Sequence, residues 1–461
     1  MKKLIVFSAI AALLAPAVFA EVGVGAWARG TVNVLEGDSL AKDESAWNGE
    51  EKRFDTMLEK DTRLGASGSH EMRAEFSGEN DEGTFGGHFK IWAQEGADSA
   101  FGWVWWKPID QFQLQLGQNK WAWFEFRPLV AWGFYEAAGD AGVVSEAWRF
   151  GNAFYGGFGD GGAALSIYPV EGMAINFGIP FERNSTVKDV YSHLHAQFSY
   201  NISDVGTLAI SYQGGKGSIE YPEWDELDHD GLFKLSKDGF DTDSGKIYAA
   251  FDISAIENVG LSIGGAFALP AKTWDDNKTD GDKANDNYDK AAKEATTFNP
   301  PVYVGVGFSY GADSFGFKAR AMAGLGASIK PGKVDEMFLG DKEQKFGTSV
   351  DVDILPYFDL GIMNLYIAAG LAMYLPSDDQ KDAGKKDPIT GEDIGDDYNV
   401  FANPIVGFHL NPYITKSIGA GTFFAGVRIY SDGKNGYSTD KDGKLNSLIK
   451  FKVPIAIIFG F

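Results

Sequence analysis

The stretch IKFKVPIAIIFGF, residues 449–461, decides the fold, because every second residue in it is large and apolar. The apolar set is Ile449, Phe451, Val453, Ile455, Ile457, Phe459 and Phe461. The residues between them are polar or small near the start, where Lys450 and Lys452 stand. Successive side chains of a strand point to opposite faces, so the pattern predicts a strand with one apolar face and one face toward a wet lumen.

The same alternation recurs along the chain. Residues 21–34 place Val22, Val24 and Val32 at even positions, against Trp27 and Arg29 at odd positions. Roughly 18 segments of this kind have about the 9–11 residues of a tilted membrane strand. They are 21–34, 61–77, 84–94, 100–107, 111–118, 161–169, 172–181, 190–201, 206–214, 245–254, 259–270, 299–310, 314–326, 345–356, 363–375, 399–410, 420–431 and 447–461. We predict an all-β protein, a closed antiparallel transmembrane barrel of 16 to 18 strands with 18 preferred.

The connections between these segments differ in length in a regular way. Long, charged connections include 35–60, 119–160, 215–244, 271–298, 327–344 and 376–398, while 78–83, 108–110 and 311–314 are short. Long external loops and short periplasmic turns are typical of outer-membrane barrels. Tryptophans 103, 105 and 106 precede a short turn, and we predict them in an aromatic girdle.

The first twenty residues, MKKLIVFSAIAALLAPAVFA, have a basic start, an apolar stretch and small residues at Val18 and Ala20. They predict a cleaved signal peptide, with residues 21–461 forming one barrel domain. The chain contains no cysteine, so no disulfide framework supports the exported protein.

Composition argues against several other classes of protein. A net charge of −23 argues against nucleic acid as a partner. The sequence offers no convincing grouping for catalysis, no phosphate loop and no metal site, so we expect no enzyme, no metal and no cofactor. The acidic stretches 275–281 and 438–443 lack the closing Glu of a calcium loop and are interpreted as turns.

The predicted inward face of the strands carries a set of basic residues. These pore-wall candidates are Arg29, Arg63, Arg73, Lys90, Lys318, Arg320 and Arg428. A lumen tolerates charge, whereas Arg or Lys at the lipid midplane costs about 2–4 kcal/mol. The residues either solvate the wall and pair with acidic neighbours, or select among permeant ions.

Signal peptide, alternating strands, unequal connections and the terminal Phe461 together resemble bacterial outer-membrane porins. The resemblance implies passive diffusion of ions and small hydrophilic solutes across the outer membrane, and often a homotrimer. It also implies that the barrel-assembly machinery reads Phe459 and Phe461 as an assembly signal. A substrate-specific channel, for example for sugars, and a surface adhesin or structural barrel remain alternatives.

The connection 119–160 is unusually aromatic for a solvated loop. In general porins the third external loop folds into the barrel and narrows it, and this connection is third in our count. By that resemblance its constriction residues are Trp121, Trp123, Glu125, Arg127, Glu136, Glu146 and Arg149. A sugar slide and packing at a subunit contact are the alternatives for its aromatic residues.

Overall fold

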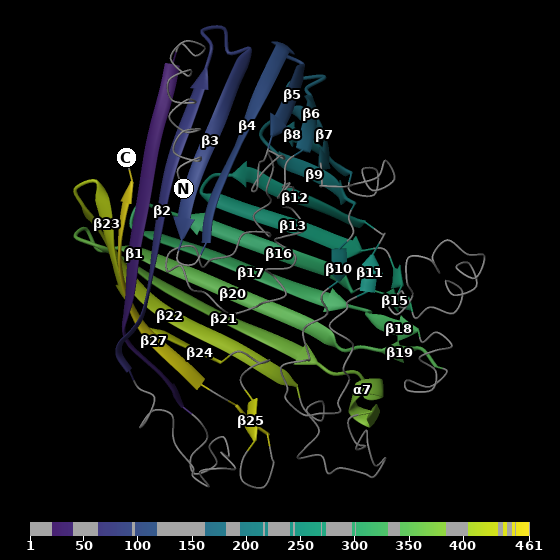
Figure 1. Ribbon diagram of the computed structural model, residues 1–461. Helices are drawn as coiled ribbons and strands as arrows, with labels where there is room; N and C mark the ends of the chain where they lie inside the picture. The colour runs from purple at the N-terminus through teal and green to yellow at the C-terminus, as the bar shows by residue number, and fades with distance from the viewer. Residues whose placement is uncertain are drawn as a thin grey trace, which may run out of the picture.

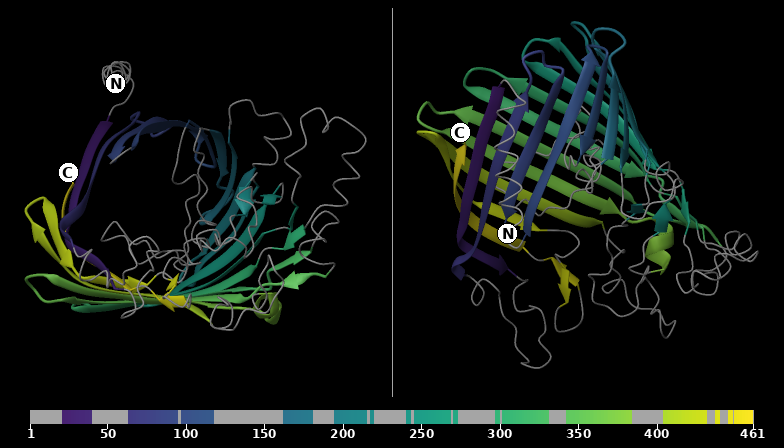
Figure 2. Two further views of the ribbon diagram at one scale, coloured as in Figure 1. Left: turned by 60° about the horizontal axis from the view of Figure 1, so that its bottom comes forward. Right: turned by 45° about the horizontal axis from the view of Figure 1, so that its top comes forward.

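In the computed structural model, each strand of the main sheet pairs antiparallel with its neighbours along the chain (Figure 1). The structure describes residues 21–39, 63–94, 97–117, 162–180, 194–214, 217–219, 240–242, 245–268, 270–272, 297–299, 301–330, 342–383, 404–431, 437–439, 445–447 and 449–460. The first strand, β1 (Glu21–Ser39), also pairs with the last, β27 (Ile449–Gly460), so the sheet closes on itself. Figure 2 shows the strands arranged as a ring.

The remaining strands of the main sheet follow in chain order. They are β2 (Arg63–Glu79), β3 (Phe85–Gln94), β4 (Ala97–Ile109), β5 (Phe112–Gly117), β6 (Gly162–Ile167), β7 (Met173–Pro180), β8 (His195–Ile202), β9 (Gly206–Gln213), β12 (Lys246–Ile256), β13 (Val259–Ala268), β16 (Val302–Gly311), β17 (Phe315–Leu325), β20 (Thr348–Asp359), β21 (Asn364–Leu375), β22 (Ile405–Ile418), β23 (Gly421–Gly426) and β24 (Arg428–Ser431).

The short strands β23 and β24 are two parts of one barrel strand, because both pair with β22 and β27 in a single register. The interruption at Val427 has a local cause. The Val427 N–H donates to the Pro412 carbonyl at 3.0 Å, but proline has no N–H to return the bond. The described residues therefore form a closed antiparallel barrel of 18 strands, which confirms the predicted fold and the preferred strand number.

The ends of some strands differ from the prediction. The predicted strand 399–410 ends just before Asn411 and Pro412, a dipeptide that often marks a turn, yet β22 continues to Ile418. The strand continues because Pro412 lies beside the interrupted strand, where its missing N–H breaks only one ladder position. β1 likewise runs to Ser39, through a register shift between Asn33 and Leu35.

Tight turns join the strands at one end of the barrel. Between β2 and β3, Asn80 Oδ1 accepts hydrogen bonds from the backbone N–H of Thr84 at 2.8 Å and of Phe85 at 2.9 Å. Asp204 and Asn258 adopt positive φ of 60° and 63° in two other turns, a conformation that Asp and Asn tolerate better than most residues.

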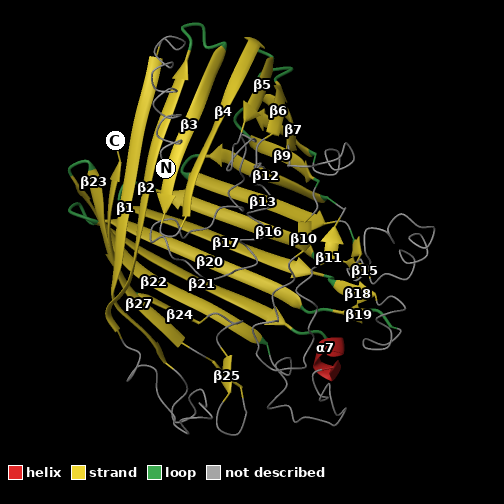
Figure 3. Cartoon of the chain, viewed as in Figure 1, coloured by secondary structure: helices red, strands yellow, loops and turns green. Residues whose placement is uncertain are grey.

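At the opposite end, where the long connections lie, short strands add further pairing. β14 (Ala271–Lys272), β15 (Thr297–Asn299), β18 (Ser328–Lys330) and β19 (Gln344–Lys345) form a second sheet. Two hairpins pair β10 (Gly217–Ile219) with β11 (Phe240–Thr242) and β25 (Tyr437–Thr439) with β26 (Leu445–Ser447). The helix α7 (Asp378–Ala383) is drawn red in Figure 3. Its Gln380 accepts a hydrogen bond from the Gly347 N–H at 2.8 Å, which ties α7 to the start of β20.

The two faces of the barrel have opposite chemistry. Apolar side chains point outward and are exposed, as Val24 and Met72 at 60% show. At alternate positions polar and charged side chains point inward and are mostly buried, as Asp351 and Asp353 do between the exposed Val352 and Ile354. This two-residue period is the pattern from which the barrel was predicted. In the part of the chain that the structure describes, no helix has the length and apolar character needed to cross a membrane.

Candidate functional site: the inward face of the barrel

The inward face divides into three sectors with different side chains. We call them the cation–aromatic sector (β1–β4), the neutral polar sector (β6–β13) and the ion-pair sector (β17–β24). In each sector the ladder register brings residues that are distant in sequence into one transverse row across neighbouring strands.

The cation–aromatic sector is built around Arg73. The register places Trp27 of β1, Arg73 of β2 and Trp92 of β3 in one row. The Arg73 guanidinium carbon lies 4.7 Å from the centre of the Trp27 ring and 4.5 Å from that of Trp92. Arg29 approaches the same Trp27 ring at 5.7 Å. Stacking on aromatic rings fixes the orientation of these guanidinium groups while they keep their positive charge.

The next rows of this sector add Lys90 and a histidine–tryptophan pair. Lys90 forms an ion pair with Glu75 of β2, and its Nζ lies 6.0 Å from the centre of the Phe101 ring. His88 stacks on Trp103 with ring centroids 4.4 Å apart. Positive charge and aromatic surface therefore alternate over the inner side of β1–β4.

The tryptophans before the turn at residue 110 only partly follow the predicted girdle. Trp106 points outward and is 51% exposed, as a girdle residue would be. Trp103 and Trp105 lie on the opposite, inward face, so the prediction was wrong for these two residues. Trp103 stacks on His88, and the ring of Trp105 fills the space that a Cβ at Gly86 would occupy. The cause is strand parity, since residues 103 and 105 alternate with 104 and 106.

The neutral polar sector is named for one buried row of uncharged side chains. Across β6, β7, β8, β9 and β12 the register aligns Ser166, Asn176, Gln197, Ser211 and Tyr248. All five are buried. Gln197 Nε2 donates to Ser211 Oγ at 3.1 Å. No composition signal separates these amides and hydroxyls from ordinary strand residues, and sequence reasoning did not identify them.

The ion-pair sector brings together ionisable side chains from three strands across a glycine of a fourth. Arg320 of β17 and Asp353 of β20 form a buried ion pair. His409 Nε2 of β22 lies 3.9 Å from Asp353 Oδ1, across Gly370 of β21. A Cβ at Gly370 would overlap both the His409 ring and the Asp353 carboxylate, so glycine permits this approach.

An aromatic row lies on the same inward face, nearer to the short turns. Tyr357, Tyr366, Tyr413 and Phe424 follow one another across β20–β23, with successive ring centroids 5.7, 4.8 and 4.9 Å apart. Tyr413 and Phe424 are buried in a cluster with Leu355, Ala368 and Ala456. Aromatic pairs at these distances contribute to stability beyond the area that they bury.

The structure places the pore-wall candidates as follows. Arg29, Arg73 and Lys90 come together in the cation–aromatic sector, while Arg320 and Arg428 are buried in the ion-pair sector, where Arg428 lies 4.4 Å over the Tyr430 ring. Lys318 shares the inward face of β17 with Arg320 and is exposed. Arg63 begins β2 opposite Glu36, and its side chain lies outside the described ones.

The remaining sequence-based candidates fall mostly beyond the described residues. These are the constriction residues Trp121, Trp123, Glu125, Arg127, Glu136, Glu146 and Arg149, and also Phe461 and the predicted signal peptide. Phe459 is described, points outward and is 48% exposed. Among the described residues no group of three or more His, Cys, Asp or Glu side chains is placed to hold a metal ion.

Comparisons with known proteins find similarity at the level of three-dimensional structure. No family model and no curated protein sequence matches the chain. Solved structures that resemble it include Pseudomonas aeruginosa OpdQ, with 10% identity, a TM-score of 0.46 and coverage of 95% of this chain and 98% of that one. The outer membrane channel DcaP of Acinetobacter baumannii has 12% identity, a TM-score of 0.45 and coverage of 96% and 97%. A triple mutant of Rhodopseudomonas blastica porin has 12% identity, a TM-score of 0.38 and coverage of 96% and 100%.

Proposed function

We propose that this protein is an outer-membrane porin, through which ions and small hydrophilic solutes diffuse passively. The observation that carries the proposal is the closed 18-strand barrel whose outward face is apolar and whose inward face is charged and polar. A barrel that leaves no strand edge satisfies its backbone hydrogen bonds within a bilayer. A polar inner face is the surface that water and hydrated solutes require.

The cation–aromatic sector supports a role of the wall in ion preference. Arg29 and Arg73 lie within one group of aromatic rings, and Lys90 follows in the next row. Side chains held in place exert a field of fixed direction on a passing ion, whereas long solvated side chains average their positions. We propose that Arg29, Arg63, Arg73 and Lys90 favour anions at this side of the lumen.

The connection 119–160 is the proposed constriction. It leaves β5 at Gly117 and enters β6 at Gly162, and these two residues are direct ladder partners. The segment therefore starts and ends at one point of the rim. The residues between these ends are enough for the chain to reach across a lumen and return. Its aromatic residues would be covered by the inner wall rather than by water. By the resemblance to porins, we also propose insertion by the barrel-assembly machinery and a homotrimer.

Reconstitution of the refolded barrel in planar lipid bilayers tests the proposed function. A porin gives discrete conductance steps that grow in proportion to salt concentration and do not saturate. Liposomes that contain the barrel should swell in small sugars and not in large dextrans. Saturation of transport by one solute would instead indicate a substrate-specific channel, and the absence of conductance from a folded barrel would contradict the proposal.

A further inference from the structure

A cavity of about 520 Å³ opens at the short-turn end of the neutral polar sector. It is lined by the turn after β4, by the turn from β6 to β7, and by inward residues of β7, β8 and β9. Cavities of roughly 300–1,000 Å³ are the size of small-molecule sites. The volume therefore fits an organic solute rather than a single hydrated ion.

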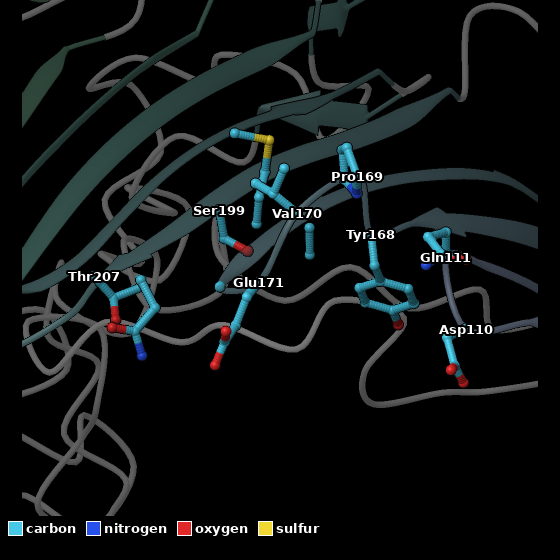
Figure 4. Close-up of a pocket in the computed structure, with 12 residues that line it drawn as sticks. Asp110, Gln111, Tyr168, Pro169, Val170, Glu171, Ser199 and Thr207 are labelled. Atoms are coloured by element: carbon cyan, nitrogen blue, oxygen red, sulfur yellow. The ribbon is translucent and has the colours of Figure 1, made fainter.

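The side chains around this cavity have one sign of charge. Its lining contains Asp110 and Glu171 and no Lys or Arg. Asp110 forms an exposed ion pair with Lys107 at 3.3 Å, which is a weak interaction in water. Glu171 has no ion-pair partner in the described part of the chain. Tyr168 lines the same cavity, and Figure 4 shows its ring between these two carboxylates in this view.

Hydroxyl and amide groups complete the cavity on the side of the lumen. Ser199 is only 8% exposed, lines the cavity, and has no hydrogen-bond partner among the described residues. Asn201 and Thr207 line the same side and are direct ladder partners. A hydroxyl on a largely buried residue in a cavity wall, with no protein partner among the described residues, offers a position where a ligand donates or accepts a hydrogen bond.

The backbone of the turn is fixed where the cavity is built. Gly172 has φ of +78°, and its absent Cβ lets the turn approach the Asn201 carbonyl. The Asn201 N–H donates to the Gly172 carbonyl at 2.7 Å, which ties the turn between β6 and β7 to β8. Glu171 and Tyr168 are therefore carried by a turn with a defined conformation.

We propose that this cavity binds a small organic cation that carries a primary ammonium group. Glu171 pairs with the ammonium, the Tyr168 ring provides a cation–π surface, and Ser199 accepts a hydrogen bond from the ammonium. Asp110 receives a second ammonium when the solute is a diamine. The role of this site rests on the proposed channel function, because the site would hold such solutes at the short-turn mouth of the pore.

The test uses the full barrel and 1,4-diaminobutane as the probe. The diamine is added to the short-turn side of oriented single channels, and the concentration that reduces the current by half is measured. In the E171Q variant this concentration should rise about tenfold, which corresponds to about 1.4 kcal/mol. The S199A variant should show a smaller rise, and 1,4-butanediol, which has no charge, should leave the current unchanged.

The matched control is D313N, which removes a carboxylate from the turn between β16 and β17, outside the cavity. Its half-blocking concentration should equal that of the parent. An equal rise in D313N and E171Q would overturn the proposal, because the effect would then come from the general charge of the rim.

Calorimetric titration of the detergent-folded barrel with the same diamine gives a reading that does not depend on conduction. Binding without channel activity would retain the site and reject the proposed channel function. Channel activity without binding would reject the site alone.

Discussion

At the scale of single residues, one added carbon atom at Gly370 has a clear expected effect. It separates Asp353 from His409 in the ion-pair sector, and a Cβ would overlap both side chains. We predict that G370A lowers the free energy of unfolding by about 1–3 kcal/mol, the usual cost of overpacking. Urea unfolding of the barrel in detergent, followed by tryptophan fluorescence, measures the change.

The control for this substitution is G30A. Gly30 lies on β1, is exposed, and has nothing within 4 Å of the position of a Cβ. The free energy of unfolding of G30A should stay within about 0.5 kcal/mol of that of the parent, as for most surface substitutions. Equal stability of G370A and the parent would show that Asp353 and His409 do not depend on the glycine.

Arg29 and Arg73 allow a residue-scale test of the wall. Replacing both with Gln removes two positive charges from the inward face and preserves much of the packing on Trp27. We predict that the reversal potential in a salt gradient shifts toward cation preference, and that the shift is larger in dilute salt, where the Debye length is longer. Adding Arg63→Gln should extend the shift.

Lys416 provides a control of the same charge. It lies in β22 near the short turn and is exposed. K416Q should change the reversal potential less than either arginine substitution. A double arginine variant that conducts with the reversal potential of the parent would mean that these side chains do not line the pore.

At the scale of the element, substitutions on the two faces of β27 test the role of its outward apolar face. Phe459 points outward, whereas Gly460 lies opposite Trp27 of β1 and has room for a small side chain, because the nearest atom is 3.7 Å from the place that a Cβ would take. We predict that F459S lowers the yield of folded barrel in the outer membrane more than G460S does, because it removes an outward apolar side chain that lipid would cover, and moving a Phe side chain out of water contributes about 1.5–3 kcal/mol. Heat-modifiable migration on gels separates folded from unfolded protein.

Refolding of the same variants into lipid vesicles separates the two reasons for such a loss. A defect in vesicles as well as in cells indicates lost contact with lipid. A defect in cells alone indicates an assembly signal that the insertion machinery reads, and F461S should then behave like F459S. Equal yields of F459S and G460S in both settings would contradict the prediction.

The elements also show how far sequence reasoning reaches. Strand positions were predictable because a period of two is visible in residues such as Val350, Val352 and Ile354, which alternate with acidic residues. The ion-pair sector was predictable only in part: Arg320 was expected to face inward, but its pairing with Asp353 depends on the register of β17 against β20. The cavity at Glu171 is lined by two turns and three strands, and no local pattern indicates it.

At the scale of the whole molecule, the proposed constriction makes a prediction for conductance. Deleting residues 121–150 should raise the single-channel conductance, because the proposal places this segment in the path of the ions. Deleting residues 274–296 from another long connection is the control, and it should leave the conductance unchanged. An unchanged conductance in the first variant, with a folded barrel, would place the constriction elsewhere.

The pairing of β1 with β27 has a consequence for the order of events in folding. β1 has one partner, β2, next to it in chain order, but its second partner is the last strand of the sheet. Until β27 arrives, β1 presents a row of unpaired backbone groups along its free side, which is a template for association with other chains. Contacts between residues so distant in sequence form slowly. We therefore expect that the pairing of β1 with β27 limits the rate of folding. We also expect that a chaperone must cover the free side of β1 until β27 is in place.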